Sequence, residues 1–215
     1  MDLEPVVILG AGGHAKVVIE LLRAQGRAIA GLTDADSAPR SVLGVPVVGD
    51  DTALAGLRDR GVRHAFVAIG DNAARQAAGA RATDLGFILV NAVSPTASVS
   101  ASARLGHGVA VMAGAVINAD AVIGDLAIVN SGAIVDHDCH LERCCHVGPG
   151  AVLAGGVRLG AGALIGVGAS VTPGCSIGAR TIVGAGACVV ADLGADVTAI
   201  GVPARPVAPA AGGRS

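Results

Sequence analysis

A repeat of six residues runs from residue 93 to about residue 194 and limits what this chain can fold into. Seventeen consecutive hexads carry Val, Leu or Ile at the first position, and Leu193 alone is large at the fifth. Gly often follows the aliphatic residue, as at Gly106, Gly124 and Gly148. A period of six fits neither the 3.6-residue helix nor the alternation of an ordinary strand. It is typical of a parallel β-helix, in which each hexad forms one flat side and a turn.

The two restricted positions predict how the coils stack. We expect the aliphatic residue to point into the shaft and the small residue to lie where the chain turns a corner. Three sides of six residues give a triangular coil, so the hexads supply nearly six coils. With strands about 4.8 Å apart, the prism would be roughly 27 Å tall. Because each coil pairs with the next, only the two ends of the prism would be open edges.

Residues 1–92 follow a different pattern, in which short apolar strands alternate with helical segments. This alternation predicts a small Rossmann-like parallel sheet wound by crossovers, in front of the β-helix. We therefore expect three parts: an α/β domain (1–92), a parallel β-helix (93–194) and a C-terminal loop and tail (195–215), with a loose end from Val207. The expected strands are 6–9, 28–32, 64–69 and 87–90, and the expected helices are 17–25, 51–60 and 73–85. Asp50 or Asp51 is expected to cap the second of these helices.

Composition excludes several classes of partner. The net charge is −2 and only 15% of residues are charged, so the chain lacks the basic surface that nucleic acids require. It has two Phe and no Tyr or Trp on which single-stranded bases could stack. The N-terminus has no basic segment of a signal peptide, and no apolar run approaches the length of a membrane span. A soluble, cytoplasmic protein is expected.

The five cysteines raise the question of a metal site or disulfides. Cys139, Cys145 and Cys175 occupy the small position of the hexad, which predicts that they fill the core. Cys144 and Cys188 lie off that position, but their spacing does not resemble a zinc site. We expect no metal.

A glycine-rich loop, Gly10-Ala11-Gly12-Gly13-His14, follows the first expected strand. Backbone N–H groups and a helix N-terminus at such a loop favour a phosphate. The loop satisfies a relaxed dinucleotide fingerprint, with Asp34 near the distance expected for a ribose-binding acid. The alternatives are a tight turn needed only for packing, or a nicotinamide cofactor. Because 92 residues supply only half of a dinucleotide fold, the diphosphate of another nucleotide fits the size better.

Four histidines lie among the hexads and none is at an inward position: His107, His137, His140 and His146. His137 has an aspartate on each side, Asp136 and Asp138. A carboxylate that contacts one ring nitrogen fixes the tautomer and raises the basicity of the other, which is what a general base needs. A solvated surface histidine is the alternative from spacing alone.

Several segments together resemble a known family. They are GAGGHAKVV (10–18), the acids Asp34 and Asp36, AIGDN (68–72), VDHDCHLERCCHVGPGA (135–151) and AIGVPAR (199–205). In this combination the chain resembles the nucleotide-sugar acetyltransferases with left-handed β-helices, which include sialic-acid O-acetyltransferases and bacillosamine-pathway N-acetyltransferases. The resemblance covers nearly the whole chain, and the left-handed sense of the β-helix comes from it.

The resemblance implies roles for particular residues. His137 would be the catalytic base and Asp138 the acid that tunes it. Acetyl-CoA would contact His146 and, through the backbone, Val167 and Ala185. The nucleotide sugar would be bound by Gly12, Gly13, His14, Lys16, Asp34, Asp36 and Gly70. Some relatives have two adjacent acids where this chain has Asp34-Ala35-Asp36, which leaves the preferred base open.

The resemblance also implies an activity and an assembly. We expect a homotrimer with CoA between adjacent prisms. The expected reaction transfers the acetyl group of acetyl-CoA, without a metal, to the C4 amine of a nucleotide-linked amino sugar of the GDP-perosamine type. The product would serve the synthesis of surface polysaccharides such as O-antigen. O-acetylation of sialic acid or another sugar is the alternative. More distant alternatives are a metal hydratase of the γ-carbonic-anhydrase type, a nicotinamide-dependent oxidoreductase and a scaffold without activity.

Overall fold

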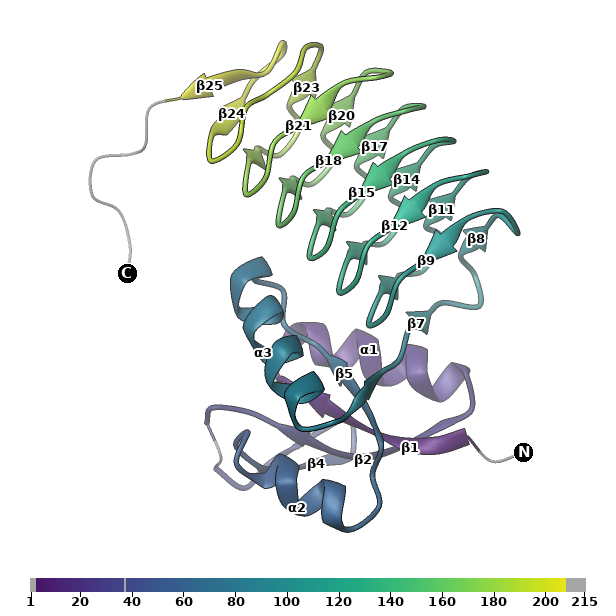
Figure 1. The fold of residues 1–215 in the computed structure, drawn as a ribbon, viewed down its shortest axis with the longest axis vertical. Coiled ribbons are helices and arrows are strands. Elements are labelled where there is room, and N and C mark those ends of the chain that lie inside the picture. Colours follow the sequence, from purple (N-terminus) through teal and green to yellow (C-terminus); the bar gives the residue numbers. More distant parts are fainter. Residues whose placement is uncertain (1–2, 37, 208–215) are drawn as a thin grey trace.

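A computed structural model describes residues 3–36 and 38–207 of the chain. A small α/β unit is followed by a tall triangular prism of coils, and α1 and α3 lie against the first coils of this prism (Figure 1). The predicted fold class, a small parallel sheet followed by a parallel β-helix, is confirmed. The predicted loose end from Val207 falls almost wholly outside the described residues.

The α/β unit contains a six-stranded sheet in the order β3-β4-β2-β1-β5-β6, parallel except for the β3–β4 hairpin. Helix α1 covers one face and packs on Val6, Ile8 and Phe66, while α2 and α3 cover the other. The elements are β1 (Leu3–Leu9), α1 (Gly13–Ala24), β2 (Arg27–Thr33), β3 (Ser41–Val42), β4 (Val45–Gly49), α2 (Ala53–Asp59), β5 (His64–Val67), α3 (Asn72–Asp84) and β6 (Ile88–Leu89).

Two local predictions in this unit were wrong. Helix α1 begins at Gly13 and not at Val17, because the glycine-rich segment contributes its own first helical turn after an extended Gly12. Helix α2 has Thr52 at its N-cap, and no side chain caps it there. Asp50 still acts next to this end, since its Oδ1 accepts hydrogen bonds from the backbone N–H of Thr52 (2.9 Å) and from its hydroxyl (2.6 Å).

The prism consists of two-residue strands on three faces. Each strand pairs in parallel with the corresponding strand of the next coil, as between Val111 and Val129, so each coil has the predicted length of three hexads. We name the faces by one member each. The β16 face is β25-β24-β22-β19-β16-β13-β10-β7, the β14 face is β23-β20-β17-β14-β11-β8, and the β15 face is β21-β18-β15-β12-β9.

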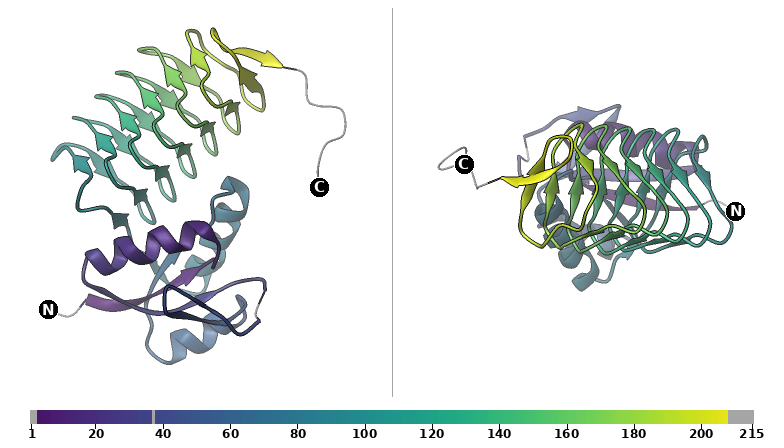
Figure 2. Two further views of the ribbon diagram at one scale, coloured as in Figure 1. Left: turned by 180° about the vertical axis from the view of Figure 1, so that it is seen from behind. Right: turned by 90° about the horizontal axis from the view of Figure 1, so that it is seen from above.

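Each hexad contributes one strand whose second residue is the inward aliphatic one; Figure 2 shows the stacked coils from two more directions. These strands are β7 (Ala92–Val93), β8 (Ser98–Val99), β9 (Arg104–Leu105), β10 (Ala110–Val111), β11 (Val116–Ile117), β12 (Val122–Ile123), β13 (Ile128–Val129), β14 (Ile134–Val135), β15 (His140–Leu141), β16 (His146–Val147), β17 (Val152–Leu153), β18 (Arg158–Leu159), β19 (Leu164–Ile165), β20 (Ser170–Val171), β21 (Ser176–Ile177), β22 (Ile182–Val183) and β23 (Cys188–Val189).

The chain continues past the hexads in regular structure. Strand β24 (Thr198–Ile200) pairs with β22 and extends the β16 face, and β25 (Arg205–Val207) returns antiparallel to it. Residues 195–207, expected to form a loop and tail, therefore contain two strands. The division of the chain at residue 92 stays a prediction, and β7 already begins at Ala92.

The core of the prism is the stacked column that the period predicted. Residues at the first and fifth positions from Val109 to Val189 are buried, and Cys139, Cys145 and Cys175 lie among them as core fillers. Glycine at the second position has a steric reason: a Cβ on Gly124 would lie 2.6 Å from the backbone nitrogen of Arg143, one coil further on. The coils stack too closely at this corner for a side chain.

Replacement of Leu153 by alanine should lower the free energy of unfolding by about 2–5 kcal/mol, because the cavity would lie between Val135 and Val171 in a rigid column. Guanidinium unfolding of the purified protein measures this change. Val152→Ala is the matched control, since Val152 is the outward-facing neighbour and should cost less than about 1 kcal/mol. Equal losses for both variants would contradict the inward register.

Candidate active site

His137 lies on the turn between β14 and β15, where it projects from an edge of the prism with 61% of its side chain exposed. Its Nδ1 lies 2.7 Å from Oδ2 of Asp138, and Asp136 accepts a hydrogen bond from its backbone N–H. The Asp138 hydrogen bond, followed by the charge of Asp136, raises the pKa of His137 above its ordinary value. Nε2 is left free to accept a proton from a bound molecule.

The backbone of this turn explains how the pair is presented. Asp138 has φ +60°, a left-handed conformation that glycine adopts at the same position of many other coils. Asp and Asn tolerate this region better than other residues with a side chain. Gly155 lies one coil above His137, and a Cβ there would be 2.6 Å from Nε2 of the imidazole. Gly155 is a site residue that the sequence analysis missed; because it follows His137 by one full coil, the register of the hexads could have identified it.

The second part of the site is a cavity of about 640 Å³ between α3 and the prism, which we call the α3 cavity. Gly70 and His146, which the sequence analysis assigned to different substrates, both line it. Its walls come from the start of α3 and from the β16 face with the adjoining edge. The lining residues are Gly70, Asp71, Asn72, Ala73, Gln76, Arg143, His146, Ala161, Gly162, Leu164, Arg180 and Ile182.

His146 is held neutral in this cavity. Burial, together with the positive charge of Arg75 and the proximity of His14, lowers its pKa to about 4. Nδ2 of Asn130 lies 3.0 Å from Nε2 of His146. Because an amide NH₂ group can only donate, Nε2 accepts and the ring proton is on Nδ1. His146 is therefore suited to binding and not to taking up a proton at neutral pH.

Val167 and Ala185 lie on a different edge of the prism. They occupy successive turns after β19 and β22, and both are exposed. The N–H of Gly186, next to Ala185, donates to the carbonyl of Val167 and so joins the two turns. The chain turns at this same edge, between the β16 face and the β14 face, directly after β16 and His146. Neither residue lines the α3 cavity.

The glycine-rich loop brings backbone N–H groups to the start of α1, with Gly12, Gly13 and Lys16 exposed. His14 is half-buried and its Nε2 is buried without a hydrogen-bond partner. Burial and then the charge of Arg75 lower the pKa of His14 to about 4. A neutral, unpartnered ring nitrogen at this loop is a potential hydrogen-bonding group for a ligand.

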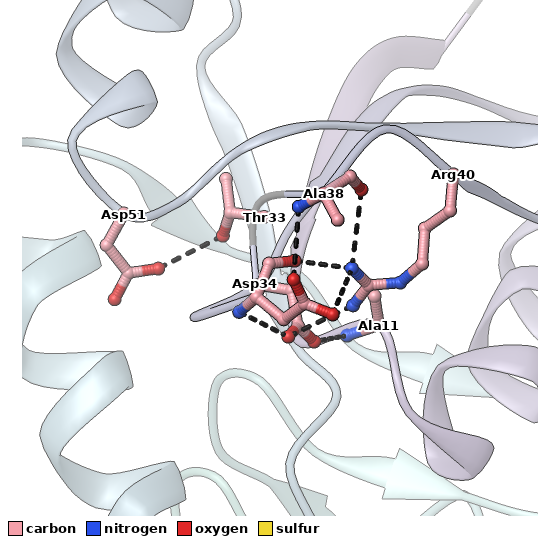
Figure 3. Close-up of polar contacts among 7 residues, drawn as sticks. Ala11, Thr33, Asp34, Ala38, Arg40 and Asp51 are labelled. Atoms are coloured by element: carbon pink, nitrogen blue, oxygen red, sulfur yellow. Dashed lines mark hydrogen bonds and ion pairs between the residues drawn. The ribbon is translucent and has the colours of Figure 1, made fainter.

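Asp34 lines a second cavity, of about 530 Å³, at the carboxyl end of the sheet, which we call the sheet cavity. Its Oδ2 accepts a hydrogen bond from the N–H of Ala11 (2.8 Å), and its Oδ1 lies 3.1 Å from Arg40 (Figure 3). Partial burial would raise the pKa of Asp34, but the N–H groups of Ala11 and Asp36 and the Arg40 charge outweigh it and lower this pKa. Asp36 is exposed and also pairs with Arg40.

The other wall of the sheet cavity was not predicted from the sequence. The lining residues there include Thr33, Asp51 and Arg81. Asp51 accepts from the hydroxyl of Thr33 (3.1 Å), which Figure 3 shows, and pairs with Arg81 at 2.5 Å. Asp51 was considered only as a helix cap, because its partner on α3 is distant in the sequence and no local pattern connects the two.

Within residues 3–36 and 38–207, no group of three His, Cys, Asp or Glu side chains could hold a metal ion. None of the helices in that part of the chain is long and apolar enough to cross a membrane.

Comparison with known proteins identifies relatives along almost the whole chain. Residues 5–81 match the PglD N-terminal domain family. Perosamine N-acetyltransferase from Caulobacter crescentus, solved as a histidine-to-asparagine variant with CoA and GDP-perosamine, is 61% identical with a TM-score of 0.95, over 96% of this chain and 98% of that one. The acetyltransferase domain of PglB from Neisseria gonorrhoeae, solved with acetyl coenzyme A, is 40% identical with a TM-score of 0.89, over 95% and 99%.

A more distant likeness supports the fold alone. WeeI from Acinetobacter baumannii is 24% identical with a TM-score of 0.85, over 95% of this chain and 100% of that one. A search of curated proteins gave no match.

A left-handed hexapeptide prism that follows a PglD-type α/β domain is the architecture of an acetyltransferase, so the predicted enzyme class is confirmed. With 61% identity over 96% of its length, the chain belongs to the family of nucleotide-sugar N-acetyltransferases that includes perosamine N-acetyltransferase. The resemblance inferred from the sequence is thereby confirmed.

Replacement of Asp138 by asparagine should lower the pKa of His137 toward its ordinary value, because the largest contribution that raises it is removed. Asparagine tolerates the left-handed backbone, so the turn should persist. Titration of the His137 ring protons by NMR measures the shift. The control is Asp196→Asn, which breaks a distant pair with Arg180 and should leave this pKa unchanged. An unchanged His137 pKa in Asp138→Asn would contradict the assignment.

Proposed function

We propose that the protein transfers the acetyl group of acetyl-CoA to the C4 amine of a GDP-linked amino sugar of the perosamine type. The single observation that carries this proposal is the exposed His137–Asp138 pair, with its free Nε2, in a chain 61% identical to perosamine N-acetyltransferase. Structures of that relative include variants with one histidine replaced by asparagine or alanine, which is consistent with a histidine base.

The proposed reaction is direct transfer. The sugar amine loses a proton to Nε2 of His137 as its nitrogen attacks the thioester carbonyl, and the carbon–sulfur bond then breaks to release the CoA thiolate. Asp138, on Nδ1, orients the ring and stabilises the imidazolium that forms. Gly155 packs against the imidazole, and its N–H has no acceptor among the described residues, so we assign this N–H to the developing oxyanion.

The two substrates would occupy different parts of the chain. The sheet cavity, with Asp34, and the loop of Gly12, Gly13 and His14 suit the nucleotide and its diphosphate. Lys16 and Asp36, both exposed, would lie at the margin of this site. Acetyl-CoA would contact His146 and the backbone of Val167 and Ala185. Because CoA is the expected donor, the reaction would take place in the cytoplasm.

A second copy of the chain would complete the site. The turn that carries His137 joins the β14 and β15 faces, so it lies on the edge opposite the β16 face. The α3 cavity, with His146 and Gly70, lies on the β16 face and the edge beside it. One chain therefore holds its base and this cavity on different sides of the shaft. We propose a homotrimer in which His137 of one subunit serves the cavity of the next.

Replacement of His137 by asparagine should lower kcat/KM by about 10²–10⁴, the range for loss of general acid–base catalysis. Steady-state assays would use acetyl-CoA with GDP-linked and UDP-linked 4-amino sugars and with free sialic acid. Activity of the wild-type protein on the GDP-linked amine is the expected result. Activity on sialic acid alone would favour O-acetylation, and a loss below about threefold in His137→Asn would refute the base role.

Mixed trimers test the shared site. His137→Asn and Leu164→Glu, which places a charge in the wall of the α3 cavity, should each be nearly inactive alone. Co-expressed at equal levels, they should recover about a quarter of wild-type activity if each site joins His137 of one subunit to the cavity of its neighbour in a cyclic trimer. No recovery would mean that both residues act within one subunit or that the assembly differs.

A further inference from the structure

Arg75, on α3, has a buried guanidinium group that the proposed reaction does not use. Its side chain is 1% exposed, and among the described residues none of its hydrogen-bond acceptors is a carboxylate. The acceptors are the carbonyl oxygens of Leu126 (2.7 Å), Ile69 (3.1 Å), Gly70 (2.9 Å) and Cys144 (2.9 Å) and the side-chain oxygen of Asn72 (2.7 Å).

The acceptors come from two parts of the chain that are far apart in sequence. Ile69 and Gly70 belong to the segment that joins β5 to α3, and Asn72 is the first residue of α3. Leu126 and Cys144 lie on turns of two successive coils. Arg75 therefore bonds to the loop and to the prism with one rigid, planar group.

Asn72 extends this connection to a third coil. Its Nδ2 donates to the carbonyl of Gly162 at 2.8 Å while its Oδ1 accepts from Arg75. The acceptors at Leu126, Cys144 and Gly162 occupy the same position on three successive coils, so they form one column along an edge of the prism. Helix α3 also packs closely against the first of these turns, since a Cβ on Gly79 would lie 2.5 Å from Cδ1 of Leu126.

These bonds connect the two walls of the α3 cavity. Gly70 and Asn72 form part of one wall, and Gly162 and His146 form part of the other. Arg75 bonds to Gly70 and to Cys144 of the prism, and Asn72 bonds to Gly162. A buried cation whose hydrogen-bond acceptors are all neutral is costly, and an apolar side chain of similar size would often be at least as stable. The better reason for an arginine here is therefore that its planar guanidinium group donates several hydrogen bonds in fixed directions, and not that it adds stability.

We propose that Arg75 is a positioning residue for acetyl transfer, which holds the Gly70–Asn72 loop at a fixed distance from the prism so that acceptor amine and thioester meet. This inference rests on the proposed function. A displacement of about 1 Å at a distance from the reacting atoms can lower the rate about 10²-fold.

The test is Arg75→Lys, which keeps the positive charge but removes the planar guanidinium group with its several N–H donors. The turnover number for the GDP-linked amino sugar should fall at least tenfold, because lysine cannot bond to both walls at once. The affinity for GDP alone, measured by calorimetry, should stay within about twofold of wild type. Among the residues that line the sheet cavity, Arg75 bonds only to the carbonyl of Ile69, and a lysine ammonium can still donate one such bond. The matched control is Arg58→Lys, whose guanidinium bonds to Leu85 within the α/β unit and should affect neither value.

The outcomes separate the possibilities. A fall in turnover with unchanged GDP binding, in a variant whose circular dichroism matches wild type, supports the proposal. Unchanged turnover overturns it, and so does a parallel loss of GDP binding, which would indicate general damage to the α/β unit. If Arg75→Lys does not fold, Arg75→Gln, which removes the buried charge, carries the same test. Inactivity of the wild-type protein on GDP-linked amines would refute the proposed function instead.

Discussion

The whole structure depends on the pairing of each coil with the next one along the chain. Backbone hydrogen bonds between the coils fix the rise per coil at about one strand spacing. Inward side chains must then stack in one column, and each outward side chain lies directly above its counterpart in the preceding coil. This constraint explains why Gly155 lies over His137 and why glycine is needed at Gly124, where the next coil leaves no room for a Cβ. A substitution on one coil therefore changes the packing of the residue at the same position on the next coil.

The same constraint makes the prism a rigid support for groups at its turns. The turns leave carbonyl oxygens in a regular column, and the α/β unit uses that column: Arg75 and Asn72 bond to it at Leu126, Cys144 and Gly162. A regular backbone thus gives an irregular partner well-defined points of attachment. Burial lowers the pKa of His14 and of His146, and the positive charge of Arg75 lowers both further, so the two rings are neutral.

The accuracy of the sequence-based expectations followed the range of the interactions involved. The hexads, the core position of Cys139 and the parallel sheet were predicted correctly, because each depends on a pattern that repeats or on neighbours along the chain. The start of α1 was predicted about one turn too late, since glycine-rich segments can continue a helix or end one. The Asp51–Arg81 pair was missed because its members lie on separate elements.

The sequence by itself determined the prism, the α/β unit in front of it and the membership of an acetyltransferase family, because a strict period and a combination of motifs are properties of the linear chain. It also identified His137 with its neighbouring acid, since residues 137 and 138 are adjacent. Only the tertiary structure decided which groups share a cavity. Gly70 and His146 meet at the α3 cavity, while His137 lies on the opposite edge. The physical reason is that docking of α3 on the prism, through the buried Arg75, joins residues that no local pattern relates.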